Sequence, residues 1–413
     1  MEQVSRERLE SILAERRRRF DAAESAAAGI IEKVRAAGDE ALAEFTLRFD
    51  GVALKRFQVG PAETMAARRA FLTGEWLARL QRVTDRLVDF ARRELPAGFT
   101  AGGRGERVER VFNPISPVGI YIPAGTAPLV STVLMTVVPA RVAGVREIVL
   151  VTPPDRRGRA NPAVVATAAW LGVERIFKIG GAQAVAALAF GTRQVPRVAK
   201  IVGPGNEYVA AAKRLLYGRV DIDCPAGPSE VVVCADRTAP VEFVKAELAA
   251  QAEHRQGLAV LVTADRSFAR KMLAAGGPGV MRLVTPGRLV DELNGLAPEH
   301  LVLIGRSAAG LARRIDRAGA VFVGAYSPVA LGDYLAGPSH VLPTGGAAAA
   351  FSGLSVLTFL RSSSRIAWSR SGLKAWARDL EALAELEGLP AHRLSVNRRF
   401  SPVPARGGRA AEK

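Results

Sequence analysis

The chain has 413 residues, of which 49% are hydrophobic and 23% charged, as in a globular protein long enough for two or more packed units. No apolar run reaches the roughly 18 residues of a membrane span. The charged N-terminus also lacks the apolar stretch of a secretory signal, so we expect a cytoplasmic protein without a membrane partner. The net charge of +17 favours acidic partners, but no zinc-finger spacing or RNA-binding aromatic motif accompanies it. We therefore do not expect nucleic-acid binding to be its main function.

Residues 1 to about 95 have helical periodicity, and Pro96 with the glycines that follow ends this region. From Val118 onward, helical segments alternate with eight β-branched runs: GIYIP, REIVLVTPP, RIFKIGG, VAKIVGPG, SEVVVCAD, GLAVLVTAD, HLVLIG and AVFVG. A last helix is expected from about Gly372 to Glu387, before a loose basic tail beyond Pro402. Strand–helix alternation predicts largely parallel sheets. Because eight runs exceed one small sheet, we predict an α/β fold with two open, largely parallel, incomplete Rossmann-like domains and small helical terminal segments.

Three turns after predicted strands stand out, because open parallel sheets bind ligands at the carboxyl ends of their strands. Tyr121 precedes a Pro-Ala-Gly turn, Gln183 stands at a helix start after KIGG, and Asn206 follows GPG in the same way. A glycine turn that opens a helix exposes backbone N–H groups that suit phosphate. None of the three matches G-x-G-x-x-G, so ordinary capped turns and a cofactor site both stay open.

The chain has only four histidines, and each has an acidic or amide neighbour in a short polar or Pro/Gly-marked segment. The histidines are His254, His300, His340 and His392, and the neighbours are Gln251, Glu299, Asp333 and Glu387. Imidazole is a common metal ligand and proton carrier near neutral pH, so the set is a candidate metal and acid–base site. Each residue taken singly is also compatible with a helix cap or a surface position.

Gln251 and His254 lie three residues apart on a predicted helix and therefore on one face, where two side chains can share an ion. Gln is a poorer zinc ligand than His, Cys or a carboxylate, so a polar helix end is the alternative. Glu299 and His300 stand directly before a predicted strand. In that loop both can face one cleft for proton transfer, and a solvated loop is again the alternative.

Ser229 and Glu230 follow the Pro-rich bend CPAGP and lead straight into a predicted strand. They either contact a substrate or simply begin the strand. Cys224 and Cys234 are the only cysteines and form no CxxC pair, so we interpret both as ordinary thiols.

Nine strings, in order, resemble the motif series of the histidinol dehydrogenase family: GIYIPAG, GGAQAVAALAFG, GPGNEYVAAAK, CPAGPSEVVV, AELAAQAEH, LAPEHL, GDYLAGPSHVLPTGG, GLSVLTFL and EGLPAHRLSV. They span roughly Val118 to Val396. The resemblance implies NAD-dependent oxidation of L-histidinol to L-histidine in two steps through a bound aldehyde, with one zinc ion per site. This is the last reaction of histidine biosynthesis. The resemblance also implies a homodimer whose C-terminal segment reaches the neighbouring active site.

The resemblance assigns roles to the residues singled out above. The implied zinc ligands are Gln251, His254, Asp333 and His392. The implied catalytic residues are His300, the general base, and Glu299, which activates water. The implied substrate contacts are Ser229, His340 and Glu387, together with His300 and the four zinc ligands. The implied NAD contacts are Tyr121, Gln183 and Asn206. Glu387 and His392 would come from the other subunit.

The resemblance also implies a division of the chain. Residues 1–16 form an N-terminal helical segment, and 17–120 with 231–354 form a first α/β domain with the metal and catalytic residues. Residues 121–230 form a second, NAD-binding α/β domain, and 355–413 form a C-terminal helical segment that reaches the partner subunit.

Three features depart from the usual family pattern. The segment after His254 is about one residue shorter, TGGAAAAFSG lacks an arginine often found there, and the pI of about 10.7 is unusually high. None of these removes a residue with an implied role. Two other hypotheses stay open: a zinc- and NAD-dependent relative that oxidises another small polar alcohol, such as a sulfonated diol, and a basic binding protein that keeps the fold without catalysis.

Overall fold

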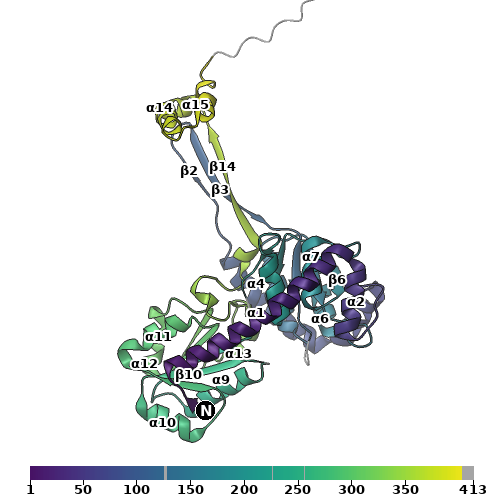
Figure 1. Ribbon diagram of the computed structural model, residues 1–413, viewed down its shortest axis with the longest axis vertical. Coiled ribbons are helices and arrows are strands. Elements are labelled where there is room, and N and C mark those ends of the chain that lie inside the picture. The colour runs from purple at the N-terminus through teal and green to yellow at the C-terminus, as the bar shows by residue number, and fades with distance from the viewer. Residues whose placement is uncertain (125–127, 226, 255, 402–413) are drawn as a thin grey trace, which may run out of the picture. The chain divides into compact units, whose positions relative to one another are not determined.

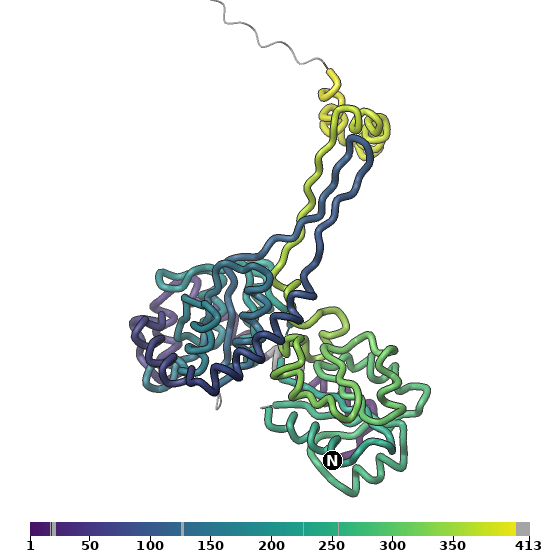
Figure 2. The backbone as a smooth tube through the Cα atoms, turned by 180° about the vertical axis from the view of Figure 1, so that it is seen from behind, coloured from purple at the N-terminus to yellow at the C-terminus, as the bar shows by residue number. Residues whose placement is uncertain are grey.

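Two parallel β-sheets and a three-stranded sheet organise the chain (Figures 1 and 2). The computed structural model describes residues 1–124, 128–225, 227–254 and 256–401, without the side chains at positions 17 and 19–21. The chain divides into a larger unit, Met1–Leu95 with Pro114–Leu360, and a smaller unit, Pro96–Asn113 with Arg361–Lys413. Both parallel sheets belong to the larger unit. The tail beyond Pro402, predicted to be loose, lies outside the described residues.

The first parallel sheet has five strands. They are β4 (Val118–Tyr121), β5 (Ile148–Thr152), β6 (Arg175–Lys178), β7 (Lys200–Val202) and β8 (Asp221–Ile222). Their spatial order is β6-β5-β4-β7-β8, and all four pairings are parallel. The chain therefore starts in the middle of the sheet, builds one edge and then returns to build the other. This reversal places β4 beside β7, and ligand crevices of open α/β sheets form at such a point.

The second parallel sheet repeats that order and adds one strand from the N-terminus. Its strands are β1 (Glu2–Gln3), β9 (Glu230–Ala235), β10 (Leu258–Thr263), β11 (Val280–Leu283), β12 (His300–Ile304) and β13 (Ala320–Val323). Their spatial order is β1-β11-β10-β9-β12-β13, again with parallel pairings. Strand order reverses between β9 and β12, where His300 lies opposite Val231.

Apolar residues fill both faces of these sheets, which explains why their strands appear in the sequence as continuous apolar runs. In β9, Val231 and Val233 pack into the core on one face. Val232 and Cys234 pack into the core on the other face. Successive side chains of a strand point to opposite faces, so a strand covered on both sides must be apolar throughout.

Helices cover both faces of each parallel sheet. One face of the five-stranded sheet packs against α1 (Arg6–Ala37), α2 (Asp39–Asp50), α7 (Gly181–Phe190) and α8 (Glu207–Leu216). Its other face packs against α3 (Pro61–Phe71), α4 (Gly74–Arg93), α5 (Val130–Val142) and α6 (Pro162–Trp170). One face of the six-stranded sheet packs against α9 (Val241–Ala252), α10 (Arg266–Ala275) and α13 (Val329–Tyr334). Its other face packs against the first turns of α1 with α11 (Leu289–Leu296) and α12 (Arg306–Ala309). Short 3-10 turns lie at Pro286–Arg288, Ala312–Arg314, Ala347–Ala349 and Val356–Phe359.

The smaller unit consists of a three-stranded sheet and two helices. Its elements are β2 (Phe99–Ala101), β3 (Glu106–Pro114), β14 (Leu360–Trp368), α14 (Arg370–Leu386) and α15 (Pro390–Asn397). The strand order is β14-β3-β2, and β2 is antiparallel to β3. The Ser369 hydroxyl caps α14 by accepting a hydrogen bond from the Gly372 N–H at 3.0 Å. Trp376 Nε1 donates to Glu106 Oε1 at 2.7 Å, which joins α14 to β3.

The predicted α/β class with two open parallel sheets is confirmed, and each of the eight predicted runs contains a strand. The N-terminal helical region holds α1 to α4, and α14 begins two residues before the predicted Gly372. The C-terminal segment predicted to be helical also contains the strand β14. The boundary placed after residue 16 falls inside α1. The division into domains and the Rossmann-like description stay predictions.

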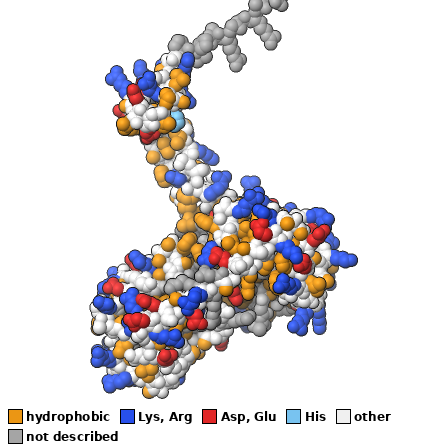
Figure 3. Space-filling model, in the orientation of Figure 1, with side chains coloured by type: hydrophobic (Ala, Val, Ile, Leu, Met, Phe, Trp, Pro, Cys, Tyr) orange, Lys and Arg blue, Asp and Glu red, His pale blue; other side chains and the backbone are white. Residues whose placement is uncertain are grey.

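Within the described ranges, no helix is long and apolar enough to cross a membrane. On the face drawn in Figure 3, Lys and Arg side chains are spread over the larger and the smaller unit, with Asp and Glu side chains among them.

Candidate functional site

Most of the predicted catalytic and zinc-binding residues lie at the amino ends of three neighbouring strands. Ser229 directly precedes β9, and His300 is the first residue of β12. Gln251 lies in the last turn of α9, and His254 follows that helix, shortly before β10. Because β10, β9 and β12 are neighbours, residues far apart in the sequence share one edge of the sheet. Glu299, which precedes His300, completes this group.

The Glu299 carboxylate is buried and held by two donors. Its Oε2 accepts hydrogen bonds from Ser229 Oγ at 2.7 Å and from the Glu230 N–H at 2.8 Å. Ser229 Oγ also lies 3.5 Å from Gln251 Oε1. The residue is 7% exposed, and burial, which outweighs the two hydrogen bonds, raises the pKa of Glu299 to about 7. Glu299 can therefore both take up and release a proton near neutral pH.

The His300 imidazole is also buried, with 5% of the residue exposed. Its Nδ1 lies 3.5 Å from Glu299 Oε2, and no hydrogen-bond partner of this nitrogen is found within the described part of the chain. The ring centre lies 5.9 Å from that of Phe322. Burial lowers the pKa of His300, although the Asp333 carboxylate opposes this shift. The imidazole is therefore neutral at pH 7 and can accept a proton.

His340 is held between two elements of the larger unit. Its Nδ1 lies 2.9 Å from the carbonyl oxygen of Asp333 in α13, and its Nε2 lies 3.2 Å from Thr132 Oγ1 in α5. Loss of water around the ring lowers the pKa of His340, and Asp333 opposes that shift while His300 and His254 add to it. These interactions place Asp333, His340, His300 and His254 in one neighbourhood.

Glu230 carries a second buried carboxylate, for which the sequence left open a substrate contact or a mere strand start. Its Oε1 accepts from the Gly345 N–H at 2.9 Å, and its Oε2 lies 4.0 Å from Arg16 Nη2. Burial, followed by repulsion from Glu299, raises the pKa of Glu230 to about 7. The sequence did not indicate Arg16, because it lies in a run of arginines that resembles an ordinary solvated helix face.

The three predicted cofactor residues lie at the carboxyl ends of strands of the other sheet. Tyr121 ends β4, and its hydroxyl accepts from the Gly181 N–H at 3.0 Å. Burial raises the pKa of Tyr121 to about 12, so the phenol stays protonated. Gln183 lies in the first turn of α7, after β6, and its buried Oε1 has no hydrogen-bond partner among the described residues. Asn206 follows β7 and caps α8 by accepting from the Val209 N–H at 3.1 Å.

A buried ion pair lies beside the edge of the sheet that carries these three residues. Lys213 Nζ pairs with Asp223 and donates to the carbonyl oxygen of Gly203 at 3.0 Å. Asp223 Oδ2 accepts from the Gly203 N–H at 2.8 Å. The pair ties the start of the GPGN turn to the segment after β8, which leads into Ser229.

Glu387 and His392 lie in the smaller unit. Glu387 directly follows α14, His392 lies in α15, and both are exposed. Among the described residues, no group of three or more His, Cys, Asp or Glu side chains is placed to hold a metal ion. Of the three predicted zinc ligands in the larger unit, His254 and Asp333 have such side chains, whereas Gln251 supplies an amide.

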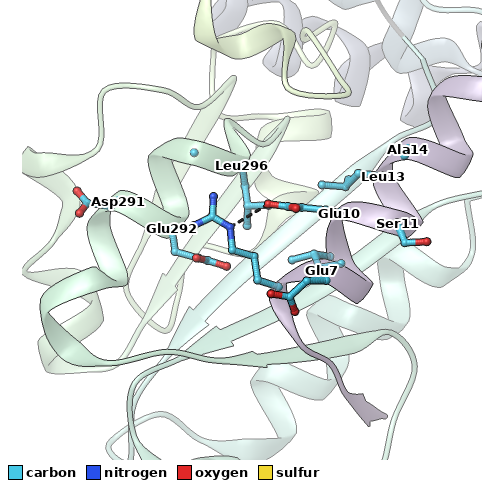
Figure 4. Close-up of a pocket in the computed structure, with 11 residues that line it drawn as sticks. Glu7, Glu10, Ser11, Leu13, Ala14, Asp291, Glu292 and Leu296 are labelled. Carbon is cyan, nitrogen blue, oxygen red and sulfur yellow. Dashed lines mark hydrogen bonds and ion pairs between the residues drawn. The ribbon is translucent and has the colours of Figure 1, made fainter.

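A depression elsewhere on the larger unit has no part in this site. It lies between the first turns of α1 and helix α11, with Arg6 and Glu10 paired at 2.9 Å on one side and Glu292 on the other (Figure 4). None of the predicted site residues lines it.

Comparisons with known proteins agree with the resemblance seen in the motifs. A sequence model described as "Histidinol dehydrogenase" matches residues 13–276 and 279–400. The histidinol dehydrogenase of Syntrophotalea carbinolica is 45% identical over 399 residues, covering 91% of this chain and 92% of the relative. That of Moorella thermoacetica is 46% identical over 395 residues, covering 90% and 92%.

A solved structure shows the same fold. The crystal structure of histidinol dehydrogenase from Elizabethkingia anophelis superposes with a TM-score of 0.85 at 35% identity, covering 91% of this chain and 92% of that chain. Family match, identity and fold agree over nearly the whole length of the sequence. The chain belongs to the histidinol dehydrogenase family.

Proposed function

We propose that the protein is a zinc-dependent histidinol dehydrogenase that oxidises L-histidinol through L-histidinal to L-histidine, with NAD as oxidant. The observation that carries this proposal is the buried His300 imidazole beside Glu299. Burial keeps the imidazole neutral, which a general base at working pH requires. The carboxylate lies close enough to take part in the same proton transfers.

In this proposal, His300 takes the proton of the substrate alcohol in the first oxidation and that of the hydrated aldehyde in the second. Glu299 activates the water that forms the hydrate, and Ser229 Oγ and the Glu230 N–H hold its carboxylate in place. Bound NAD would accept the hydride in each step. Proton removal favours hydride departure because negative charge develops on the oxygen that stays behind.

The residues of the site fit a zinc ion with mixed nitrogen and oxygen ligands. The amide oxygen of Gln251, which lies 3.5 Å from Ser229 Oγ, is the atom of that side chain that could coordinate the metal. Gln251 Nε2 and His300 Nδ1 are buried without hydrogen-bond partners in the described part of the chain, as expected where a polar substrate is to bind beside it. The proposed ligands are Gln251, His254, Asp333 and His392 of a second subunit. Zinc with open coordination positions would hold the imidazole and amino nitrogens of the substrate.

The proposed cofactor contacts are Tyr121, Gln183 and Asn206. The partnerless Oε1 of Gln183 supports this assignment, because it could accept a hydrogen bond from a hydroxyl or amide donor of the dinucleotide. The backbone N–H groups at the start of α7 suit the phosphates. Ser229, His340 and Glu387 are the proposed substrate contacts. A location in the cytoplasm stays a prediction.

We propose a homodimer with shared sites, which the exposed apolar residues of the smaller unit support. Helix α14 exposes Trp376, Leu380, Leu383 and Leu386, and Leu386 is 83% exposed. Apolar side chains at this helical spacing form a face that water disfavours, and such faces commonly mark an interface. A second copy of the chain is the proposed occupant, which would also deliver Glu387 and His392.

The first experiment measures NADH formation from L-histidinol and NAD with purified protein, before chelation, after chelation and with zinc restored. Zinc-dependent formation of histidine is expected. Absence of turnover in zinc-loaded protein would argue against L-histidinol as substrate and direct the search to other small polar alcohols.

Shared sites are tested by mixing His300→Ala and His392→Ala subunits after mild dissociation. Each variant alone should be nearly inactive. Random reassociation makes half of the dimers mixed, and each of these has one intact site, so about a quarter of wild-type activity should return. If the mixture is as inactive as each variant alone, the two residues act within one subunit.

A further inference from the structure

Arg16 lies within helix α1 and contacts the two segments that carry proposed substrate and zinc residues. Its Nη1 donates to the carbonyl oxygen of Gln256 at 2.6 Å. Its Nη2 donates to the carbonyl oxygen of Pro228 at 2.9 Å and lies 3.4 Å from that of Ser229. The same nitrogen lies 4.0 Å from Glu230 Oε2, and the Arg16 side chain is 18% exposed. One guanidinium thus spans the approaches to β9 and β10.

These two segments meet each other as well as Arg16. The Leu258 N–H donates to the carbonyl oxygen of Ser229 at 3.1 Å, and the Gly257 N–H donates to that of His254 at 2.8 Å. Ser229 in turn holds Glu299. The Arg16 guanidinium therefore bridges the segment that follows His254, a proposed zinc ligand, and the segment that contains Ser229, a proposed substrate contact.

The backbone at Gln256 has an unusual conformation, which contacts from outside the segment help to stabilise. Gln256 has φ +64°, a left-handed conformation that non-glycine residues rarely adopt. The backbone of Gly257 lies directly against Gln251, because a Cβ added there would be 2.4 Å from the Gln251 carbonyl oxygen and 3.0 Å from its Nε2. A shift of this segment would therefore displace the Gln251 carboxamide.

We propose that Arg16 is a positioning residue for the zinc and substrate site, which rests on the function proposed above. The planar guanidinium has five donors in a fixed arrangement, so it can bind carbonyl groups of both segments at once. By fixing the segments relative to each other, it sets the geometry in which Gln251 and His254 meet Ser229.

The test compares Arg16→Met and Arg16→Lys with Arg18→Met, an exposed arginine two residues further along α1. Zinc retention is measured on the purified proteins against graded chelator, and KM and kcat are measured for L-histidinol. Loss of a group that orients metal ligands typically costs 10-fold to 100-fold in metal affinity or activity, so we expect Arg16→Met to lose zinc affinity and to raise KM by about that factor. The zinc affinity and KM of Arg16→Lys should lie between those of Arg16→Met and the wild type, because an ammonium keeps the charge without the planar array of donors. Arg18→Met should match the wild type.

Wild-type zinc affinity and KM in Arg16→Met would overturn the inference, even if that variant melts at a lower temperature. If Arg16→Met does not fold, the same result in Arg16→Lys overturns it. Failure of the proposed function is distinct, because the wild type itself would then not oxidise L-histidinol. Zinc retention would still differ between wild type and Arg16→Met if the positioning role is correct.

Discussion

The two parallel sheets share one strand order but present their proposed site residues at opposite edges. In the five-stranded sheet, Tyr121, Gln183 and Asn206 lie where strands end and helices begin. In the six-stranded sheet, Ser229 and His300 lie where strands begin, close to the carboxyl end of α9. The expectation that ligands bind at the carboxyl ends of parallel strands therefore fits only the proposed cofactor edge.

The helix ends give a physical reason for this difference. A helix N-terminus presents N–H groups and partial positive charge, which suits the phosphates of NAD. A helix C-terminus presents carbonyl groups and partial negative charge, which suits a cation. Gln251 and His254 lie at the C-terminus of α9, so the proposed zinc would receive favourable electrostatics from the helix. The same strand order can thus serve an anion at one edge and a cation at the other.

The largest effect is expected on kcat when the proposed base at the amino edge of the six-stranded sheet is removed. Replacing His300 by Ala should lower kcat by about 100-fold to 10,000-fold, the range typical of general acid–base catalysis, while zinc stays bound. Steady-state kinetics with zinc analysis measures both quantities. Matched loss of zinc and activity would show instead that His300 supports the metal site.

The next effect concerns the buried ion pair at the carboxyl edge of the five-stranded sheet. Lys213→Met leaves the Asp223 carboxylate buried without its cation, which should cost about 3 to 5 kcal/mol of unfolding free energy in urea titrations. The double variant Lys213→Met/Asp223→Asn should recover much of that loss, because no unpaired charge remains. A single variant as stable as wild type would mean that water reaches Asp223.

A smaller effect is expected in the pH dependence of the unfolding free energy of zinc-free protein, through Glu230 at the amino edge of the six-stranded sheet. Burial raises the pKa of Glu230 from 4.5 to about 7, so the folded state holds a proton that the unfolded state releases. The stability from this group is fully present below about pH 4.5 and is lost as pH rises to about 7. Glu230→Gln cannot ionise, so over that range its stability should rise relative to wild type by about 3 kcal/mol. Parallel pH profiles of unfolding free energy for the two proteins would contradict this expectation.

The smallest effect is expected at an exposed ion pair of the smaller unit. Arg393 Nη1 lies 3.3 Å from Glu385 Oε2, and both side chains are largely exposed. Glu385→Ala should change the unfolding free energy by less than about 1 kcal/mol, because water and salt screen such pairs. Compared with Lys213→Met, this variant tests whether burial determines the size of the effect.

Strands with two buried faces were the easiest part to predict, because their apolar runs stand out against the helices. β3 and β14 were missed, because their polar sequences ERVERVFNP and LRSSSRIAW carry no such run. They lie together through contacts such as Arg110 Nη1 to Ser362 Oγ, 252 residues apart. His392 was assigned to a short Pro/Gly-marked segment, and the structure places it in α15, where Pro390 occupies the first turn and its fixed φ suits a helix. His300, expected in a loop, begins β12.

The sequence by itself determined the α/β alternation and the ordered motifs that identify the family, because both depend on local residue types and spacing. Only the tertiary structure decided that Ser229 meets Glu299, that Glu230 and Glu299 share one buried edge, and that Arg16 joins the approaches to β9 and β10. These properties depend on desolvation and hydrogen bonding between segments far apart in the chain, and nothing in an isolated stretch of sequence records which distant carbonyl or carboxylate will lie beside it.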